Sequence, residues 1–318
     1  MSLSAALVTA LSLAQSARAQ GQAQGFAVER LYPSAPGAGW FVMDDLRIHG
    51  GLGGVMALTV GYAHDPLRVT DGSQHLAVVS DEAFADFGFA VTLQRWRLYV
   101  NFDAPLVIEG QSGTAGAYQF AGPSVDLGVN PDTMSDVRIG FDGRLFGTET
   151  SPFRLGIGAQ LFVPNGDIAG GDRADFNTDG TYRAMGRVLL AGDVGRFTYA
   201  GHVGIHIRPL DDSPAPGSPQ GSELLVGAAG GAKVLDWAGA AKSLVVGPEV
   251  FGATAFRSFL GSNTTALEGL LTGRLEGTDD RGPQLRIKLG AGAGLSQHFG
   301  APEWRLVFGI ELFDHTRH

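Results

Sequence analysis

The sequence lacks cysteine and carries little charge. The absence of cysteine excludes a disulfide scaffold, a Cys-ligated zinc or iron–sulfur site, and thiol catalysis. Charged residues make up only 17% of the 318 residues, and lysine occurs only at positions 233, 242 and 288. A net charge of −9 without a cluster of lysines and arginines argues against a nucleic-acid-binding protein. After the N-terminus, no apolar run reaches the roughly 20 residues that a membrane-spanning helix needs.

Glycine and apolar residues are abundant instead. The chain has 48 glycines, without the triplet period of collagen, and 44% hydrophobic residues, which is too apolar for a disordered chain. A length of 318 residues fits two ordinary soluble domains or one large all-β domain.

The N-terminus has the pattern of a secretory signal peptide. An apolar stretch from Met1 to Gln15 precedes Ala17-Arg18-Ala19, which is a small-x-small cleavage pattern. We therefore expect an exported protein that is cleaved near Ala19. The expected domains are a signal peptide at 1–19, a periplasmic lead-in or lumen plug at 20–45, a transmembrane barrel at 46–313, and a short tail at 314–318.

Hydrophobic residues then recur with a period of two, which is typical of β-strands. In the stretch 196–208, Phe197, Val203 and Ile205 fall on one face, while His202 and His206 fall on the other. About twelve such segments are predicted, each long enough to cross a bilayer as a tilted strand. They cover residues 51–64, 75–93, 96–108, 135–146, 153–163, 181–193, 196–208, 222–235, 243–256, 265–276, 283–296 and 303–313.

The predicted connections alternate between tight and extended. Residues 94–95, 147–152 and 236–241 form tight connections, whereas 108–134 and 164–180 form extended ones. Outer-membrane barrels have short periplasmic turns and longer extracellular loops. The predicted fold is therefore all-β, a transmembrane antiparallel up-and-down β-barrel of about 12 strands, with both chain ends on the periplasmic side.

Several short motifs resemble a known family. They include Phe26-Ala-Val-Glu-Arg30, Trp40-Phe41, Ser135-Asp-Val-Arg-Ile-Gly140, Gly247-Pro-Glu249 and Gly300-Ala-Pro302. In these pieces the chain resembles the N-terminal β-barrel of an OmpA-family outer-membrane protein, without the C-terminal peptidoglycan-binding domain. The resemblance implies an outer-membrane barrel and brings no catalytic residues with it.

If the apolar faces contact lipid, the alternate faces line the lumen, and arginine prevails among their charged residues. Two interpretations compete for this set: a polar pore, or a network of ion pairs that fills the interior. The candidate lumen-lining residues are Arg97, Arg138, Asp142, Arg144, Arg154, Arg183, Arg187, Glu249, Glu268, Arg274, Arg286, Lys288, Arg305 and Glu311.

One segment suggests a weak metal site. Asp175, Asn177 and Asp179 alternate before Gly180, as oxygen ligands do in the first half of a calcium loop, and Asp172 is close in sequence. The twelfth position is Gly186 instead of the usual glutamate, so a polar turn is the competing interpretation. No cofactor is expected apart from this possible loop-bound Ca²⁺.

These features predict an outer-membrane barrel that is structural or porin-like, a narrow channel for small solutes with a polar Arg-lined lumen, and not an enzyme. Three alternatives remain. The long loops could make the barrel a surface recognition or adhesion module, or the barrel could take up hydrophobic compounds or embed a lipid hydrolase. Expected partners are outer-membrane lipid, lipopolysaccharide, the barrel-assembly machinery and small solutes, but no nucleic acid.

Overall fold

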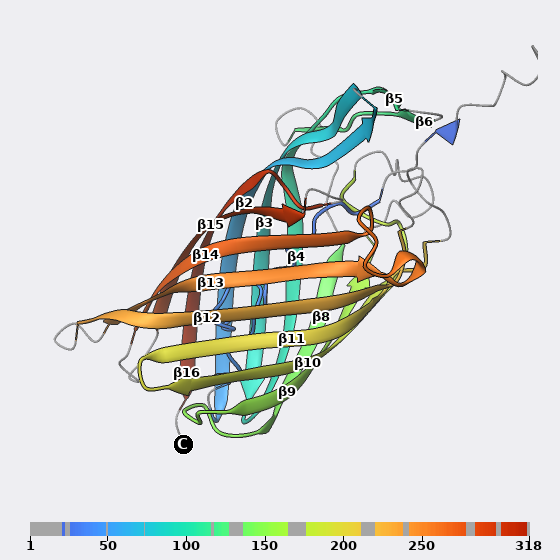
Figure 1. Ribbon diagram of the computed structural model, residues 1–318. Helices are drawn as coiled ribbons and strands as arrows, with labels where there is room; N and C mark the ends of the chain where they lie inside the picture. The colour runs from blue at the N-terminus through green and yellow to red at the C-terminus, as the bar shows by residue number, and fades with distance from the viewer. Residues whose placement is uncertain are drawn as a thin grey trace, which may run out of the picture.

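Twelve long strands form a closed antiparallel barrel in the computed structural model (Figure 1). The structure describes residues 21–22, 26–48, 50–72, 74–115, 118–126, 136–164, 176–210, 220–237, 242–277, 284–296 and 300–316. The barrel strands are β2 (Leu52–Asp71), β3 (Gln74–Leu93), β4 (Trp96–Glu109), β8 (Val137–Phe146), β9 (Arg154–Val163), β10 (Arg183–Val194), β11 (Phe197–Ile207), β12 (Glu223–Trp237), β13 (Lys242–Ala255), β14 (Thr265–Gly277), β15 (Gln284–Ser296) and β16 (Trp304–Thr316).

Each barrel strand pairs with its neighbours in sequence, and β16 closes the circle by pairing with β2. Closure pairs the backbone N–H and C=O groups of every strand edge, which a span through hydrocarbon requires. The predicted barrel is thus confirmed, and its strand boundaries agree closely. The clearest differences are that β2 continues to Asp71 and that β16 continues to Thr316, into the expected tail.

The barrel has an apolar outside and a polar inside. On β11, Phe197, Val203 and Ile205 are 60%, 54% and 49% exposed, whereas the intervening His202 and His206 are buried. This alternation follows from the period of two, because successive side chains of a strand point to opposite faces of the sheet. The apolar face is therefore the outer surface, as a lipid-embedded barrel requires.

The two ends of the barrel differ in their connections. At the short-turn end lie the connections between β3 and β4 and between β10 and β11. At the long-connection end, a small sheet of β1 (Gly21–Gln22), β6 (Tyr118–Phe120) and β5 (Gly113–Ala115) lies above the barrel (Figure 1). The further short strand β7 (Ser124–Asp126) pairs with β4.

Helix contributes little to the described chain. It includes one short 3₁₀ turn, η4 (Phe256–Ser258). None of the helices among the described residues is long and apolar enough to cross a membrane.

The chain crosses the barrel before its first long strand begins. Residues 26–48, here called the inner segment, are almost all buried. Its beginning lies at the long-connection end, where the Phe26 ring packs 5.9 Å from that of Phe176. Its end lies at the short-turn end, where Arg47 bonds to Asp193 at 2.6 Å. The expectation that both chain ends lie on one side does not hold for the described residues, because the inner segment runs through the lumen and leaves Gly21–Gln22 at the opposite end of the barrel from Thr316. The chain ends themselves lie outside the described residues.

Candidate functional site

All the candidate lumen residues named from the sequence are buried inside the barrel. None of their side chains is more than 8% exposed. They are Arg97, Arg138, Asp142, Arg144, Arg154, Arg183, Arg187, Glu249, Glu268, Arg274, Arg286, Lys288, Arg305 and Glu311. Their alternation along the strands places them on the lumen face, and the contacts that they make define the site.

Some of these residues pair across the wall. Glu311 on β16 accepts hydrogen bonds from Arg286 at 2.7 Å and from Lys288 at 2.8 Å on the neighbouring strand β15. Arg97 on β4 bonds to Asp142 at 2.9 Å on β8. Such pairs satisfy charges that would otherwise be expensive to bury.

The buried charges are balanced in sign. Among the described residues, the buried arginines and lysine equal the buried aspartates and glutamates in number. The excess of arginine expected from the sequence is offset by carboxylates such as Asp86, which pairs with Arg138 at 2.5 Å, and Asp136, which pairs with Arg183 at 2.7 Å. The lumen is thus a network of ion pairs with no dominant sign.

The inner segment folds into a tight loop at mid-lumen, held by Glu249. The backbone amide of Ser34 donates to the Phe41 carbonyl at 2.7 Å, which closes the loop. The carboxylate of Glu249 on β13 accepts hydrogen bonds from the backbone N–H groups of Phe41 at 3.0 Å, Val42 at 2.9 Å and Met43 at 3.3 Å. A buried carboxylate with several such donors is a strong anchor.

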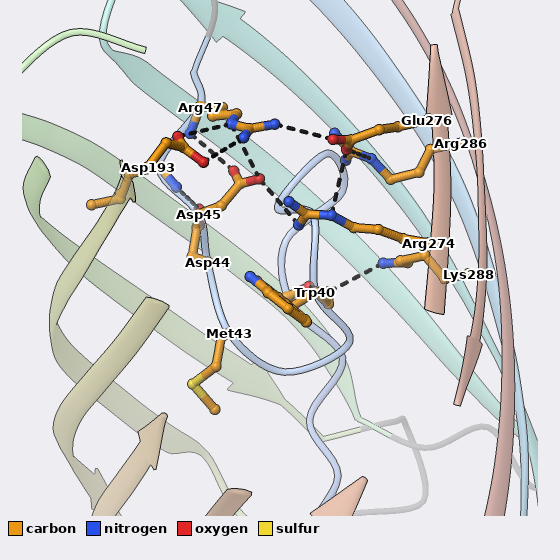
Figure 2. A network of polar contacts seen from close by, with 12 residues as sticks. Trp40, Met43, Asp44, Asp45, Arg47, Asp193, Arg274, Glu276, Arg286 and Lys288 are labelled. Carbon is orange, nitrogen blue, oxygen red and sulfur yellow. Dashed lines mark hydrogen bonds and ion pairs between the residues drawn. The ribbon is translucent and has the colours of Figure 1, made fainter. Parts of the chain in front are cut away.

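Two aspartates of the inner segment pair with arginines on the wall. Asp44 bonds to Arg97 of β4, and Asp45 lies 3.4 Å from Arg274 of β14. Figure 2 shows Asp45 between Arg274 and Arg47, with Arg47 reaching Glu276 at 3.2 Å on the opposite side. The inner segment is therefore tied electrostatically to distant strands of the barrel.

Wall arginines also bind carbonyl oxygens of the inner segment. Arg144 donates to the carbonyls of Leu46 at 2.9 Å and Ile48 at 3.0 Å, and Arg154 donates to that of Asp45 at 2.9 Å. These bonds satisfy backbone groups that have no strand partner of their own.

Aromatic side chains of the loop pack where the wall has glycine. A Cβ atom at Gly231 would lie 2.7 Å from the Trp40 ring, and one at Gly290 would lie 2.9 Å from the Phe41 ring. Arg274 stacks over Trp40 at 4.8 Å from the ring centre (Figure 2), and the Lys288 ammonium lies 5.1 Å from the centre of Phe41. The aromatic rings of the loop occupy the space that the glycines leave free, so the shape of the wall is complementary to that of the loop.

A second ion-pair cluster holds the inner segment at the long-connection end. Asp179, just before β10, accepts bonds from Arg208 at 2.6 and 2.7 Å and from the Ala27 amide at 2.9 Å. Burial raises the pKa of Asp179, but the charges of Arg208 and Arg183 outweigh it and hold that pKa well below its usual range. The carboxylate is therefore an ionised structural anchor.

These contacts decide the interpretation of Asp179. Both of its oxygens are occupied by Arg208, a cation that would repel Ca²⁺, so Asp179 serves as an ion-pair partner in this structure instead of a calcium ligand. Asn177 is half-buried, while Asp172 and Asp175 lie outside the described residues. Asp179 is therefore not available as a ligand of the predicted calcium loop.

Another possible ligand group lies at the rim. His64, Asp65 and Glu303 bring their ligand atoms within 4.8 Å of one another, the one such group among the residues described. The Nδ1 atom of His64 is already 3.1 Å from an Asp81 oxygen. His202 and His206 are four positions apart on β11, about 13 Å along a strand, and cannot share an ion.

Sequence reasoning missed the residues that complete the pairs. Glu276 lies two positions after Arg274 and so on the same face, a signal that the alternation contains. Glu29, which bonds to Arg305 at 2.7 Å, and Arg47 belong to a stretch without strand periodicity. Their roles depend on the path of the inner segment, which no local pattern encodes.

Comparison with solved structures finds the fold of outer-membrane barrels. An outer membrane channel from Pseudomonas putida F1 is similar over 84% of this chain and 96% of its own, with 13% identity and a TM-score of 0.53. The NanC porin is similar over 82% of this chain and 100% of its own, with 7% identity and a TM-score of 0.46. The outer-membrane barrel is thus confirmed at the level of fold.

The sequence comparisons add no family. No family model matches the chain. No curated protein matches it either. The resemblance to the OmpA family therefore stays a prediction.

The prediction that the protein is not an enzyme does not stand. The similar structures also include LpxR from Salmonella typhimurium, which is similar over 82% of this chain and 100% of its own at 11% identity and a TM-score of 0.39. A fold does not fix a function, because function depends on the side chains that a fold carries. The barrel fold therefore does not decide whether the protein is an enzyme.

Proposed function

We propose that the protein is an outer-membrane channel for small polar solutes, and that the inner segment is a plug that closes its lumen. The observation that carries the proposal is the set of bonds between the inner segment and the lumen wall, above all the three amides bound by Glu249. A wall built only for rigidity needs ion pairs between strands. This wall also uses Glu249, Arg97 and Arg274 to bind the inner segment, which is not a strand of the wall.

The chemistry of these bonds favours a reversible plug. Ion pairs and hydrogen bonds exchange readily for water, so a lumen that fills with water as the plug leaves recovers much of their energy. Because the buried charges balance, we expect selection by size and polarity more than by the sign of charge. The solute class is therefore small and polar.

The cellular setting follows from the same proposal. The chain would be exported with cleavage near Ala19 and inserted by the barrel-assembly machinery into a membrane that contains lipopolysaccharide. A relationship to the OmpA-family barrels is part of this proposal, and two of the shared motifs, Phe26–Arg30 and Trp40-Phe41, belong to the inner segment.

The first test is conductance in a planar lipid bilayer. Glu249→Gln keeps the size of the side chain but removes its charge. It also replaces one of the two carboxylate oxygens that accept hydrogen bonds from the backbone N–H groups of Phe41 and Val42. We expect the purified full-length variant to spend at least ten times longer in conducting states than the unchanged protein. Glu303→Gln, on a half-exposed side chain outside the loop, is the matched control and is expected to behave like the unchanged protein.

The second test locks the plug. The chain has no cysteine, and a Cβ atom at Gly37 would lie 4.0 Å from that of Val55 on β2, within the range for a disulfide. In Gly37→Cys/Val55→Cys, conductance is expected after reduction and not after oxidation. Equal conductance in both states would show that the plug does not gate the pore, and silence of every variant would exclude a channel.

A further inference from the structure

The outer wall of the barrel has an apolar hollow near the short-turn end. Its volume is about 670 Å³, and it spans five neighbouring strands, β16, β2, β3, β4 and β8. Met56, Phe89, Leu98 and Ile139 line it with outward, exposed side chains. A convex barrel wall does not by itself produce such a hollow.

The strand register explains its origin. Outward side chains on paired positions form rows across the wall. One row contains Leu312, Met56, Phe89, Val100 and Ile139, and the row nearer the short-turn end contains Asp314, Gly54, Val91 and Leu98. Gly54 interrupts the second row, and a Cβ atom placed on it would meet no atom within 4 Å. The hollow is therefore the space above a missing side chain, between two rows of apolar groups.

One acidic side chain stands at its edge. Asp314 is exposed on the outer face of β16, and no bond joins its carboxylate to another side chain in the described part of the chain. A carboxylate facing hydrocarbon is costly, so Asp314 must lie at the level of the lipid head groups. The position of Asp314 agrees with this level, because the neighbouring row of outward side chains toward the strand ends contains Trp96, a residue typical of the membrane interface.

We propose that this hollow binds one phospholipid with an amine head group. An acyl chain would lie over Gly54, between Met56 and Phe89, while the ammonium group would pair with Asp314. Apolar contact alone selects little within a bilayer, because lipid tails are as apolar as the wall. The fixed carboxylate beside a chain-sized hollow supplies the selectivity, and it favours an amine over an anionic glycerol head group. This proposal is independent of the channel function.

The test is lipid retention by the full-length protein. The protein would be taken from nanodiscs that contain equal amounts of phosphatidylethanolamine and phosphatidylglycerol, and its bound lipid measured by native mass spectrometry. We expect one retained phosphatidylethanolamine, favoured roughly two- to five-fold, the range that an exposed ion pair supplies. Asp314→Asn is expected to equalise the two lipids, and Gly54→Trp, which fills the hollow, is expected to abolish retention.

Gly186→Trp is the matched control, because Gly186 on β10 is also exposed and a Cβ atom there also meets nothing within 4 Å. It is expected to retain lipid like the unchanged protein. Heat-modifiable electrophoretic mobility would show that each variant is folded. Equal retention of both lipids by the unchanged protein, an unaltered ratio in Asp314→Asn, or full retention in Gly54→Trp would each overturn the proposal.

Discussion

At the scale of the residue, single buried carboxylates hold the inner segment. Glu249 and Asp179 are fully buried, at 0% exposure, and each binds backbone amides of the inner segment as well as wall side chains. Removing one partner from such a group leaves another buried and unpaired, which costs about 3–5 kcal/mol for a charge pair. Each carboxylate therefore contributes to the stability of the folded protein through several partners at once.

Asp179 makes the stability of the folded protein depend on pH in the acidic range. Its pKa is lower in the folded protein than in the unfolded chain, so its contribution is present above the unfolded value, about 3.9, and is lost as the pH falls below it. Asp179→Asn is expected to be less stable at pH 7, and the gap to the unchanged protein should narrow by about 1.4 kcal/mol per pH unit below pH 4. Urea unfolding in detergent between pH 7 and 2 measures this, and a constant gap would contradict it.

At the scale of the element, the strands could be predicted, whereas the path of the inner segment could not. The period of two assigned the predicted lumen-lining residues to the correct face, because every strand of a closed barrel has one face toward the lumen and one toward the outside. Residues such as Trp40 and Asp45 lack a period, and their positions depend on contacts with β12 and β14, which are remote in sequence. The sequence could suggest a plug, whereas its path and its anchors required the three-dimensional arrangement.

The glycines of the wall give a test at this scale. Gly290→Ala adds a methyl group 2.9 Å from the Phe41 ring, so we expect the ring to be displaced and the protein to lose about 1–3 kcal/mol through overpacking. Gly273→Ala is the control, because its Cβ atom would meet only the Leu289 carbonyl oxygen, at 4.0 Å. Urea unfolding midpoints should separate the two variants, and limited proteolysis should cut the inner segment faster only in the first. Equal midpoints would contradict the packing argument.

At the scale of the whole molecule, the first and last residues that the structure describes lie at opposite ends of the barrel. Gly21–Gln22 pairs with β6 above the long connections, while Thr316 pairs with Leu52 at the short-turn end (Figure 1). If the long connections are extracellular, as in outer-membrane barrels generally, Gly21–Gln22 lies on the outer side of the membrane.

Epitope labelling tests this topology. A tag inserted next to Gly21 is expected to bind antibody on intact cells, whereas a tag placed after Thr316 is expected to bind only after permeabilisation. Both tagged proteins should first show heat-modifiable mobility. Labelling of both tags only in permeabilised cells would contradict the crossing of the lumen.

The pairing of β16 with β2 has a consequence for how the molecule is made. This seam joins the last strand to the first, and the peptide in front of the first strand already runs through the ring that the seam completes. The ribosome makes β2 first and β16 last among the twelve barrel strands. The ring can therefore close only after all twelve strands have been made, and the closed ring then surrounds the segment that precedes its first strand.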